Sequence, residues 1–166
     1  MSPPSLSVLM VCTGNICRSP TAEGVLRHHL AALGLADRVR VDSAGIQGWH
    51  AGEAPDARSQ AHARRRGYDL SAQQARAVRA LDFSEADLIL AMDAGHLEAL
   101  RERCPPQAQH KLALLLDHAP GFVGRDVPDP YYGGAAGFEE VLDLVEAACR
   151  PLAAALAERL SQGQHR

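Results

Sequence analysis

The sequence predicts an α/β fold, with a four-stranded parallel sheet that carries helices on both faces. Short apolar segments rich in strand-forming residues alternate along the chain with segments whose apolar residues recur at helical spacing. This alternation is typical of parallel sheets with right-handed crossovers. The 166 residues are enough for one domain with a substantial core, so we expect a single domain over residues 1–166.

The first 34 residues predict a strand, a loop and a helix. The apolar run 6–11 is typical of a buried strand and leads into Cys12. Ser19 and Pro20 favour the start of a helix, with Ser19 as the N-cap and Pro20 as the first helical residue. Apolar residues then recur at helical spacing until Gly34, a residue type that commonly ends helices.

The rest of the chain continues the alternation. Apolar or alternating segments predict three more strands, at residues 38–42, 86–92 and 112–116. Helical patterns predict helices at residues 56–66, at residues 93–103 and from Phe138 onward, and Pro151 is expected to kink or restart the last of them. Segments 43–55 and 117–137 are predicted to be loops, and a loop as long as the second is typically functional or disordered.

Composition and charge exclude several classes of protein. The chain carries 17 basic and 20 acidic residues, a net charge of -3, which argues against a nucleic-acid partner. No apolar run approaches the roughly 18 residues of a membrane helix and no signal peptide is recognised, so we expect a cytoplasmic protein without membrane insertion. The cysteines form no Cys-x-x-Cys pair and the histidines have no metal-ligand spacing, so we expect free thiols, no metal and no cofactor. We also expect a monomer.

The segment from Cys12 to Arg18 joins the first strand to the first helix and has the composition of an anion-binding loop. Backbone N–H groups of a tight loop converge on an anion, and a helix N-terminus adds partial positive charge. The planar guanidinium of Arg18 fits two phosphate oxygens, while Gly14 and Asn15 tolerate the left-handed backbone that such a loop needs. We therefore expect a phosphate-binding loop after strand 1, formed by Thr13, Gly14, Asn15, Ile16, Cys17, Arg18 and Ser19.

Cys12 is the candidate nucleophile of this loop. In the electropositive field of the loop its thiol is expected to ionise, and a thiolate is a good nucleophile for phosphorus. The same N–H groups would hold the three equatorial oxygens of the transition state, and Ser19 is placed to donate a hydrogen bond to the sulfur. The alternative is a buried structural cysteine, which the neighbouring Gly14 and Arg18 and a downstream acid make less favourable.

A reaction at phosphorus also needs a proton donor for the group that leaves. The long loop offers Asp126 and Asp129, and we choose Asp129 because Pro128 and Pro130 stiffen the chain around it. The same carboxylate could later activate the water that hydrolyses a cysteinyl-phosphate. Asp126 remains the competing acid, and a turn residue before proline is the alternative role of Asp129.

Four segments together resemble a known family. Residues 12–20 (CTGNICRSP), 42–45 (DSAG), 91–93 (AMD) and 129–133 (DPYYG) are similar, in this order and across nearly the whole chain, to motifs of the low-molecular-weight protein tyrosine phosphatases. The resemblance implies a metal-independent protein tyrosine phosphatase that works through a cysteinyl-phosphate intermediate. It also implies a tyrosine-phosphorylated protein as the substrate and inorganic phosphate as the product.

The resemblance implies a role for individual residues as well. Cys12 becomes the nucleophile, Arg18 the phosphate clamp and Asp129 the general acid. The network of hydrogen bonds that supports the loop is implied to consist of Asn15, Ser19 and Ser43. The aromatic rim against which a phosphotyrosine ring packs is implied to consist of Trp49, Tyr131 and Tyr132.

Two further expectations concern Cys17 and a departure from the family's pattern. The family carries a paired cysteine at Cys17, and a reversible disulfide between Cys12 and Cys17 would protect the nucleophile from irreversible oxidation. The alternative is that Cys17 only packs beneath the loop. Many members have a histidine before an Ala-Arg pair, where this chain has Gln73 and Gln74. The contact of that histidine with the Asn15 network is therefore expected to be absent or made by a glutamine.

Three other functions fit parts of the pattern. An arsenate reductase of the same fold needs two further cysteines for a disulfide relay, and Cys104 and Cys149 are widely spaced. A phosphoarginine phosphatase has threonine at the position of Ile16, whose bulk fits a planar phenyl ring better than a guanidinium group. A non-catalytic phosphate-binding module is expected to lack the nucleophile or the acid, and Cys12 and Asp129 are both present. Phosphotyrosine hydrolysis is therefore the function that the sequence predicts.

Overall fold

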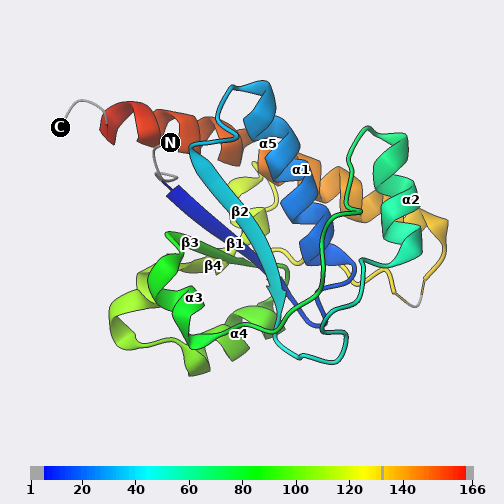
Figure 1. The fold of residues 1–166 in the computed structure, drawn as a ribbon, viewed down its shortest axis with the longest axis horizontal. Helices are drawn as coiled ribbons and strands as arrows, with labels where there is room; N and C mark the ends of the chain where they lie inside the picture. Colours follow the sequence, from blue (N-terminus) through cyan, green and yellow to red (C-terminus); the bar gives the residue numbers. More distant parts are fainter. Residues whose placement is uncertain (1–5, 132, 164–166) are drawn as a thin grey trace.

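The computed structural model describes residues 6–131 and 133–163 and contains the predicted parallel sheet (Figure 1). Within these residues the sheet has four strands, which lie in the order β2-β1-β3-β4 and are all parallel. They are β1 (Leu6–Cys12), β2 (Val39–Gly45), β3 (Leu88–Ala91) and β4 (Leu112–Leu114). The predicted fold class is confirmed, and β2 extends three residues into the segment that was expected to be a loop.

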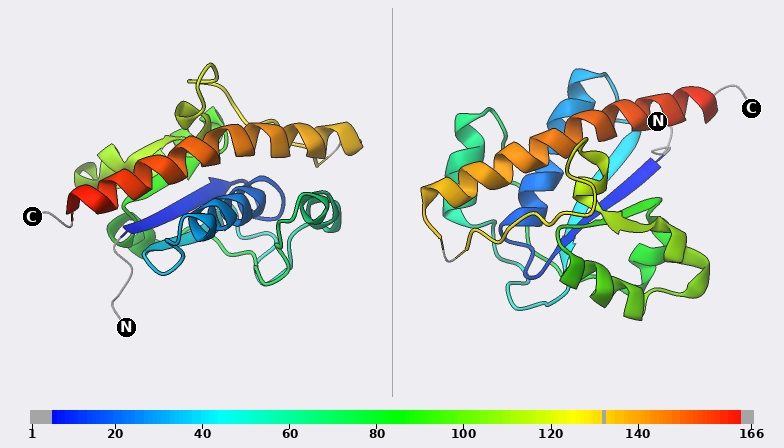
Figure 2. Two further views of the ribbon diagram at one scale, coloured as in Figure 1. Left: turned by 90° about the horizontal axis from the view of Figure 1, so that it is seen from above. Right: turned by 180° about the vertical axis from the view of Figure 1, so that it is seen from behind.

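Helices cover both faces of the sheet, as predicted. The core contacts place α1 and α5 next to each other on one face, and α3 and α4 on the other (Figures 1 and 2). None of the helices in the described residues has the length and apolar character needed to span a membrane. The helices are α1 (Arg18–Ala32), α2 (Ala57–Arg65), α3 (Ala80–Glu85), α4 (Ala94–Arg103) and α5 (Ala135–Gly163), with 3-10 helices η1 (Pro106–Lys111) and η2 (Leu115–His118) on either side of β4.

The central strand β1 is buried on both faces. Because successive side chains of a strand point to opposite faces, Val8 and Met10 enter the core formed with α1 and α5. Leu9 and Val11 enter the second core, which includes Phe83 of α3 and residues of α4. This double burial explains why the sequence of β1 is continuously apolar rather than alternating.

The start of α1 differs from the prediction. The helix begins at Arg18 with Cys17 as its N-cap residue, so the expectation of Ser19 as the N-cap was wrong. Pro20 is tolerated two residues further on because N–H groups in the first turn have no partner within the helix. The side chain of Ser19 is thereby left free of capping and takes part in the hydrogen bonds around Cys12.

The last helix continues through Pro151. One helix, α5, runs from Ala135 to Gly163 with Pro151 inside it, so of the two expected outcomes, a kink or a restart, the restart is wrong. Buried residues on both sides of the proline, including Cys149 and Leu152, hold the two halves against the same core. The short elements α3 and η1 were not predicted, because six residues are too few to show a clear helical period.

The topology places Cys12 where ligands bind in folds of this kind. From β1 the chain moves to its neighbour β2 at the edge of the sheet, and from β2 it returns past β1 to β3. The order of strands therefore reverses at β1. In parallel α/β sheets this point forms a crevice beyond the carboxyl ends of the strands. Cys12 is the last residue of β1 and pairs in register with Gly45, the last residue of β2.

The edge strand β2 has side chains and loop segments against its outer side. The carbonyl oxygen of Val41 accepts a hydrogen bond from Arg27 Nη2 at 2.6 Å. At the end of the strand, Gly45 donates its N–H to the carbonyl of Arg76 and accepts from the N–H of Val78, both at 2.8 Å. The segment around Ala77 therefore continues the sheet for one bridge beside Gly45.

Gly45 has no room for a side chain, which yields a test of the packing between β2 and the loop after β1. A Cβ atom there would lie 2.8 Å from the carbonyl oxygen of Thr13 and 2.9 Å from that of Gln47. We expect Gly45→Ala to lower the free energy of unfolding by about 1–3 kcal/mol, as overpacking does, when measured by urea denaturation. The control is Gly48→Ala, whose Cβ would meet only the Ala77 Cβ at 3.6 Å. Equal stability of the two variants would contradict this account.

Candidate active site

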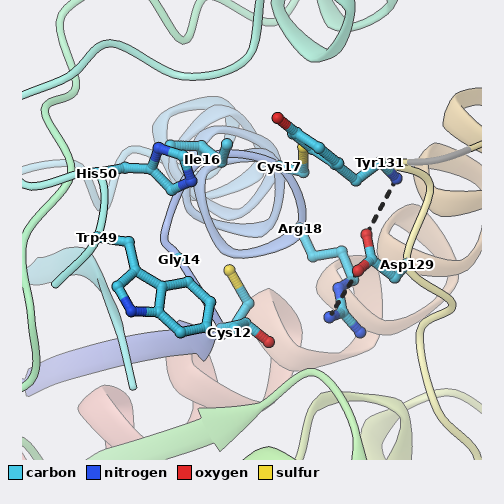
Figure 3. A pocket seen from close by; sticks show the side chains of 10 residues that line it. Cys12, Gly14, Ile16, Cys17, Arg18, Trp49, His50, Asp129 and Tyr131 are labelled. Atoms are coloured by element: carbon cyan, nitrogen blue, oxygen red, sulfur yellow. Dashed lines mark hydrogen bonds and ion pairs between the residues drawn. The ribbon is translucent and has the colours of Figure 1, made fainter. Parts of the chain in front are cut away.

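The loop between β1 and α1 curls so that both of its ends face one pocket. Asn15, in the middle of the loop, has a φ of 60°, a left-handed conformation that asparagine tolerates better than most residues. The curl places Cys12 and Arg18 in the wall of the same pocket. Figure 3 shows Asp129 and Tyr131 close to Arg18, so residues from distant parts of the chain meet at this point.

The Cys12 thiol is buried against the hydroxyl group of Ser19. Cys12 is only 3% exposed, and its Sγ is 2.9 Å from Ser19 Oγ. Asn15 Nδ2 donates a hydrogen bond to the same Ser19 oxygen at 2.8 Å. Because this donor occupies the acceptor side of the hydroxyl, the Ser19 proton is available to point at the Cys12 sulfur.

The Asn15 amide joins three segments behind the loop. Its Nδ2 donates to Ser43 Oγ at 2.9 Å as well as to Ser19, and Ser43 donates in turn to Glu23 Oε1 at 2.6 Å. The structure thus brings together the three residues of the expected network and adds Glu23, which the sequence analysis missed. The available signal was a charged residue on the buried, apolar face of α1. Burial raises the pKa of Glu23, although its hydrogen bond with Ser43 favours the charged form.

The carbonyl oxygen of the Asn15 side chain has a main-chain partner. Asn15 Oδ1 accepts a hydrogen bond from the backbone N–H of Arg76 at 3.0 Å. Gln73 donates its Nε2 to the carbonyl of Pro20 at 3.0 Å and does not reach Asn15. The alternative in which Gln73 makes the contact is therefore wrong, and the alternative in which the histidine's contact is absent remains; the Arg76 N–H donates to Asn15 Oδ1 instead.

Arg18 is buried and held in one orientation. Its Nη1 donates to Asp93 Oδ2 at 2.8 Å and to the carbonyl oxygen of Val127 at 2.9 Å. Burial disfavours the charged carboxylate of Asp93, but hydrogen bonds from the His96 N–H and from Arg18 outweigh it and lower its pKa. With Nη1 occupied, the N–H groups on Nε and Nη2 are the ones left to bind a phosphate.

The two candidate acids of the long loop have different partners. Asp129 lines the pocket, its side chain is 50% exposed, and its Oδ2 lies 3.8 Å from Arg18 Nη2. Its Oδ1 accepts a hydrogen bond from the N–H of Tyr131 at 3.0 Å, which fixes the carboxylate. Asp126 instead accepts from the N–H of Ala94 at the start of α4. The geometry therefore favours Asp129 over Asp126.

Aromatic side chains lie at the mouth of the pocket. Trp49, which is 70% exposed, and Tyr131 line it on different sides (Figure 3). Tyr132, the third expected rim residue, lies outside the described residues. The structure adds His50, which no sequence pattern indicated; its ring packs on the loop so closely that a Cβ on Gly14 would lie 2.9 Å from His50 Cδ2.

Cys17 lines the same pocket as Cys12 and differs from it in surroundings. Burial raises the pKa of the Cys17 thiol to about 12, although a hydrogen bond with Ser59 opposes the rise. Cys17 is thus a protonated thiol at ordinary pH. Both cysteines are free in the structure.

His96 lies behind the loop and was not singled out in the sequence. It is 6% exposed, and its Nε2 lies 2.7 Å from Thr13 Oγ1 and 3.4 Å from Arg18 Nη2. Burial lowers the pKa of the imidazole to about 4, although the neighbouring Asp93 favours the charged form. Within the described part of the chain, no group of three or more His, Cys, Asp or Glu side chains is placed to hold a metal ion.

The pocket combines a cysteine at the end of the first parallel strand, an arginine at the start of the next helix and a carboxylic acid. This is the set of groups that a cysteine-dependent phosphatase needs. The sequence model of the low molecular weight phosphotyrosine protein phosphatases matches residues 7–162, and the chain belongs to this family.

Relatives and solved structures agree with this assignment. The low molecular weight protein-tyrosine-phosphatase of Streptomyces coelicolor is 49% identical over 156 residues, which cover 92% of this chain and 94% of the relative. The crystal structure of YfkJ from Bacillus subtilis matches with a TM-score of 0.88 at 39% identity, over 96% of this chain and 99% of that chain. A protein tyrosine phosphatase from Entamoeba histolytica, solved with Hepes in the active site, matches with a TM-score of 0.87 at 38% identity and the same coverage.

The lowered pKa of His96 predicts a loss of stability in acid. The unfolded chain takes up this proton below about pH 6.5, whereas the folded protein takes it up only near pH 4. The stability that the neutral imidazole contributes is therefore complete above pH 6.5 and lost as the pH falls toward 4. Between pH 7 and pH 4.5 we expect urea denaturation to show that the parent protein loses about 2 kcal/mol more than His96→Gln, which has no such group. Parallel losses in the two proteins would contradict a buried neutral His96.

Proposed function

We propose that this chain hydrolyses phosphotyrosine in protein substrates, with Cys12, Arg18 and Asp129 as its reacting residues. The observation that carries the proposal is the single pocket that these three side chains line together. The pocket is built by one chain, so a monomer suffices for the reaction. The four cysteines are free thiols, which fits a reducing compartment and supports a cytoplasmic protein.

In the first step the Cys12 thiolate attacks the phosphorus atom of phosphotyrosine. An S–P bond forms, and the bond from phosphorus to the tyrosine oxygen breaks. Asp129 donates its proton to the departing oxygen, which leaves as the neutral phenol. Arg18 and the N–H groups of the loop stabilise the negative charge on the equatorial oxygens, while the Ser19 hydroxyl stabilises the thiolate before it attacks.

In the second step water releases the phosphate. The Asp129 carboxylate accepts a proton from a water molecule as the water oxygen attacks the cysteinyl-phosphate. The S–P bond breaks, inorganic phosphate is the product, and Cys12 returns to the thiolate. The fixed positive charge of Arg18 neutralises the phosphate oxygens in both steps, so the reaction needs neither a metal nor a cofactor.

The walls of the pocket support an aromatic ester as the substrate. Ile16, a residue of the loop, lines the pocket together with the aromatic rings of Trp49 and Tyr131 (Figure 3). A phenyl ring can stack on such a rim while its phosphate reaches Cys12. A phosphoserine side chain is too short to fill the same depth, so phosphotyrosine is the expected substrate.

Cys17 is proposed to protect Cys12 from irreversible oxidation. Peroxide oxidises the Cys12 thiolate to a sulfenic acid, and attack by Cys17 on that sulfur releases water and forms a disulfide. Because burial keeps the resting Cys17 thiol protonated, peroxide reacts first at Cys12. Both residues line the same pocket, which supports the pairing.

Cys12→Ser tests the nucleophile. We expect this variant to lose hydrolysis of para-nitrophenyl phosphate, measured without added metal, while it keeps its affinity for inorganic phosphate because the loop is intact. The matched control is Cys104→Ser, a buried cysteine outside the site, which is expected to keep the activity of the parent protein. Turnover by Cys12→Ser within about tenfold of the parent protein would overturn the mechanism.

Asp129→Asn tests the general acid. We expect the rate on phosphotyrosine to fall by about 10²–10⁴-fold, and the loss to shrink for aryl phosphates whose leaving groups need no proton. Asp126→Asn serves as the control, because its carboxylate is engaged at the start of α4. Equal losses across a series of leaving-group pKa values would refute the assignment of Asp129.

Cys17→Ser tests the protective disulfide. The resting activity is expected to survive, because Cys17 takes no part in the phosphoryl transfer. After a peroxide pulse, dithiothreitol should restore the parent protein but leave the variant inactive, and bound phosphate should slow inactivation of both. Full recovery of the variant, together with peptide maps that lack a Cys12–Cys17 link in the oxidised parent, would mean that Cys17 only packs beneath the loop.

A further inference from the structure

We propose that His96 is a positioning residue of the phosphatase reaction: its Nε2 accepts a hydrogen bond from Thr13 and faces Arg18, and so fixes the two elements that bind phosphate. The proposal rests on the proposed function, because it gives His96 a part in the same site. Thr13 and Arg18 line the pocket, whereas His96 lies behind them. His96 therefore acts through these two residues and not by contact with the substrate.

The N-terminus of α4 is tied to the loop and to Arg18 through two neighbouring side chains. Asp93, the N-cap of α4, accepts a hydrogen bond from the N–H of His96 on one carboxylate oxygen and from Arg18 Nη1 on the other, at 2.9 Å and 2.8 Å. The His96 ring then reaches back, with Nε2 at 2.7 Å from Thr13 Oγ1 and 3.4 Å from Arg18 Nη2. The two terminal nitrogens of the Arg18 guanidinium group thus contact residues at the start of α4, Nη1 through Asp93 and Nη2 through His96.

The contacts of the imidazole determine its tautomer. The guanidinium of Arg18 has donors only, so the Nε2 that faces it must carry the lone pair and not a proton. The Thr13 hydroxyl then donates to Nε2, and the proton of the neutral ring lies on Nδ1, which is 3.3 Å from Asp93 Oδ1 but makes no hydrogen bond within the described residues. Burial and Arg18 favour the neutral ring, whereas Asp93 and the more distant Asp129 and Asp126 favour the charged one; burial is the larger effect.

This tautomer constrains both phosphate-binding partners without adding a charge to the site. Thr13 is held at its hydroxyl by His96 and at its carbonyl oxygen by the N–H of Gln47, at 2.9 Å. Arg18 is held at Nη1 by Asp93, while Nη2 rests beside His96. A protonated imidazole or a missing acceptor would release the Thr13 hydroxyl and let Nη2 turn. The affinity for phosphate would fall in both cases.

The test compares two amide replacements of His96. Glutamine can place an amide oxygen near the position of Nε2, whereas asparagine is too short to reach Thr13. We expect His96→Asn to weaken the binding of inorganic phosphate, measured by calorimetry, by about tenfold, and to lower kcat/KM on para-nitrophenyl phosphate at least as much. His96→Gln should stay within about threefold of the parent protein in both measurements. All proteins are measured well below their thermal midpoints.

A double-mutant cycle separates positioning from packing. If His96 acts through the Thr13 hydroxyl, the effects of His96→Asn and Thr13→Val on phosphate binding should overlap and not add. Thr13→Val also stands in for His96→Asn should the latter fail to fold. Unchanged phosphate affinity in these variants, equal affinities of the asparagine and glutamine variants, or full additivity would overturn the proposal. Phosphate binding needs no turnover, so this result is read independently of whether Cys12 is the nucleophile.

Discussion

The loop after β1 keeps a curled conformation, and the side chain of Asn15 holds it in that conformation. A phosphate-binding loop depends on such support, because its backbone donors bind an anion only when the curl is fixed. The Asn15 amide fixes the curl with two donated hydrogen bonds and one accepted, which reach α1, β2 and the segment before α3. An oxyanion site that is formed in advance spends no reorganisation energy at the moment of reaction. The position of Ser19 against Cys12 depends on the same amide.

Charge within the site is balanced by pairing and by neutrality. Buried ions are tolerated only where hydrogen bonds satisfy them, and Arg18 meets this condition through Asp93 and the carbonyl of Val127. His96, next to the guanidinium, is kept neutral by burial. Burial also raises the pKa of Glu23, at the far end of the Asn15 network, and so favours the neutral form of that carboxyl group. Arg18 is thus paired with the carboxylate of Asp93, and the neutral imidazole of His96 adds no second positive charge beside it.

The sequence was sufficient for what is local and insufficient for what is long-range. Cys12 and Arg18 lie six residues apart between a strand and a helix, so their shared loop was predictable, as were the strands whose apolar runs are clear. Three contacts of the site join residues that are 61 to 83 positions apart, and no local pattern encodes them. They are the hydrogen bond from the Arg76 N–H to Asn15, the Asp93–Arg18 pair and the His96–Thr13 contact. Pro151 does not end α5, because the cost of the proline is local, whereas the burial that offsets it comes from the core.

The covered edge of β2 has a consequence for association between molecules. An edge strand normally offers a row of free N–H and carbonyl groups, which can pair with the same strand of another molecule and seed aggregates. Here the Val41 carbonyl is taken by Arg27, and both main-chain groups of Gly45 are taken by the segment around Ala77. The contacts that shape the loop side of the sheet therefore also oppose strand addition, and concentrated protein is protected along that part of the edge from growing into a continuous intermolecular sheet.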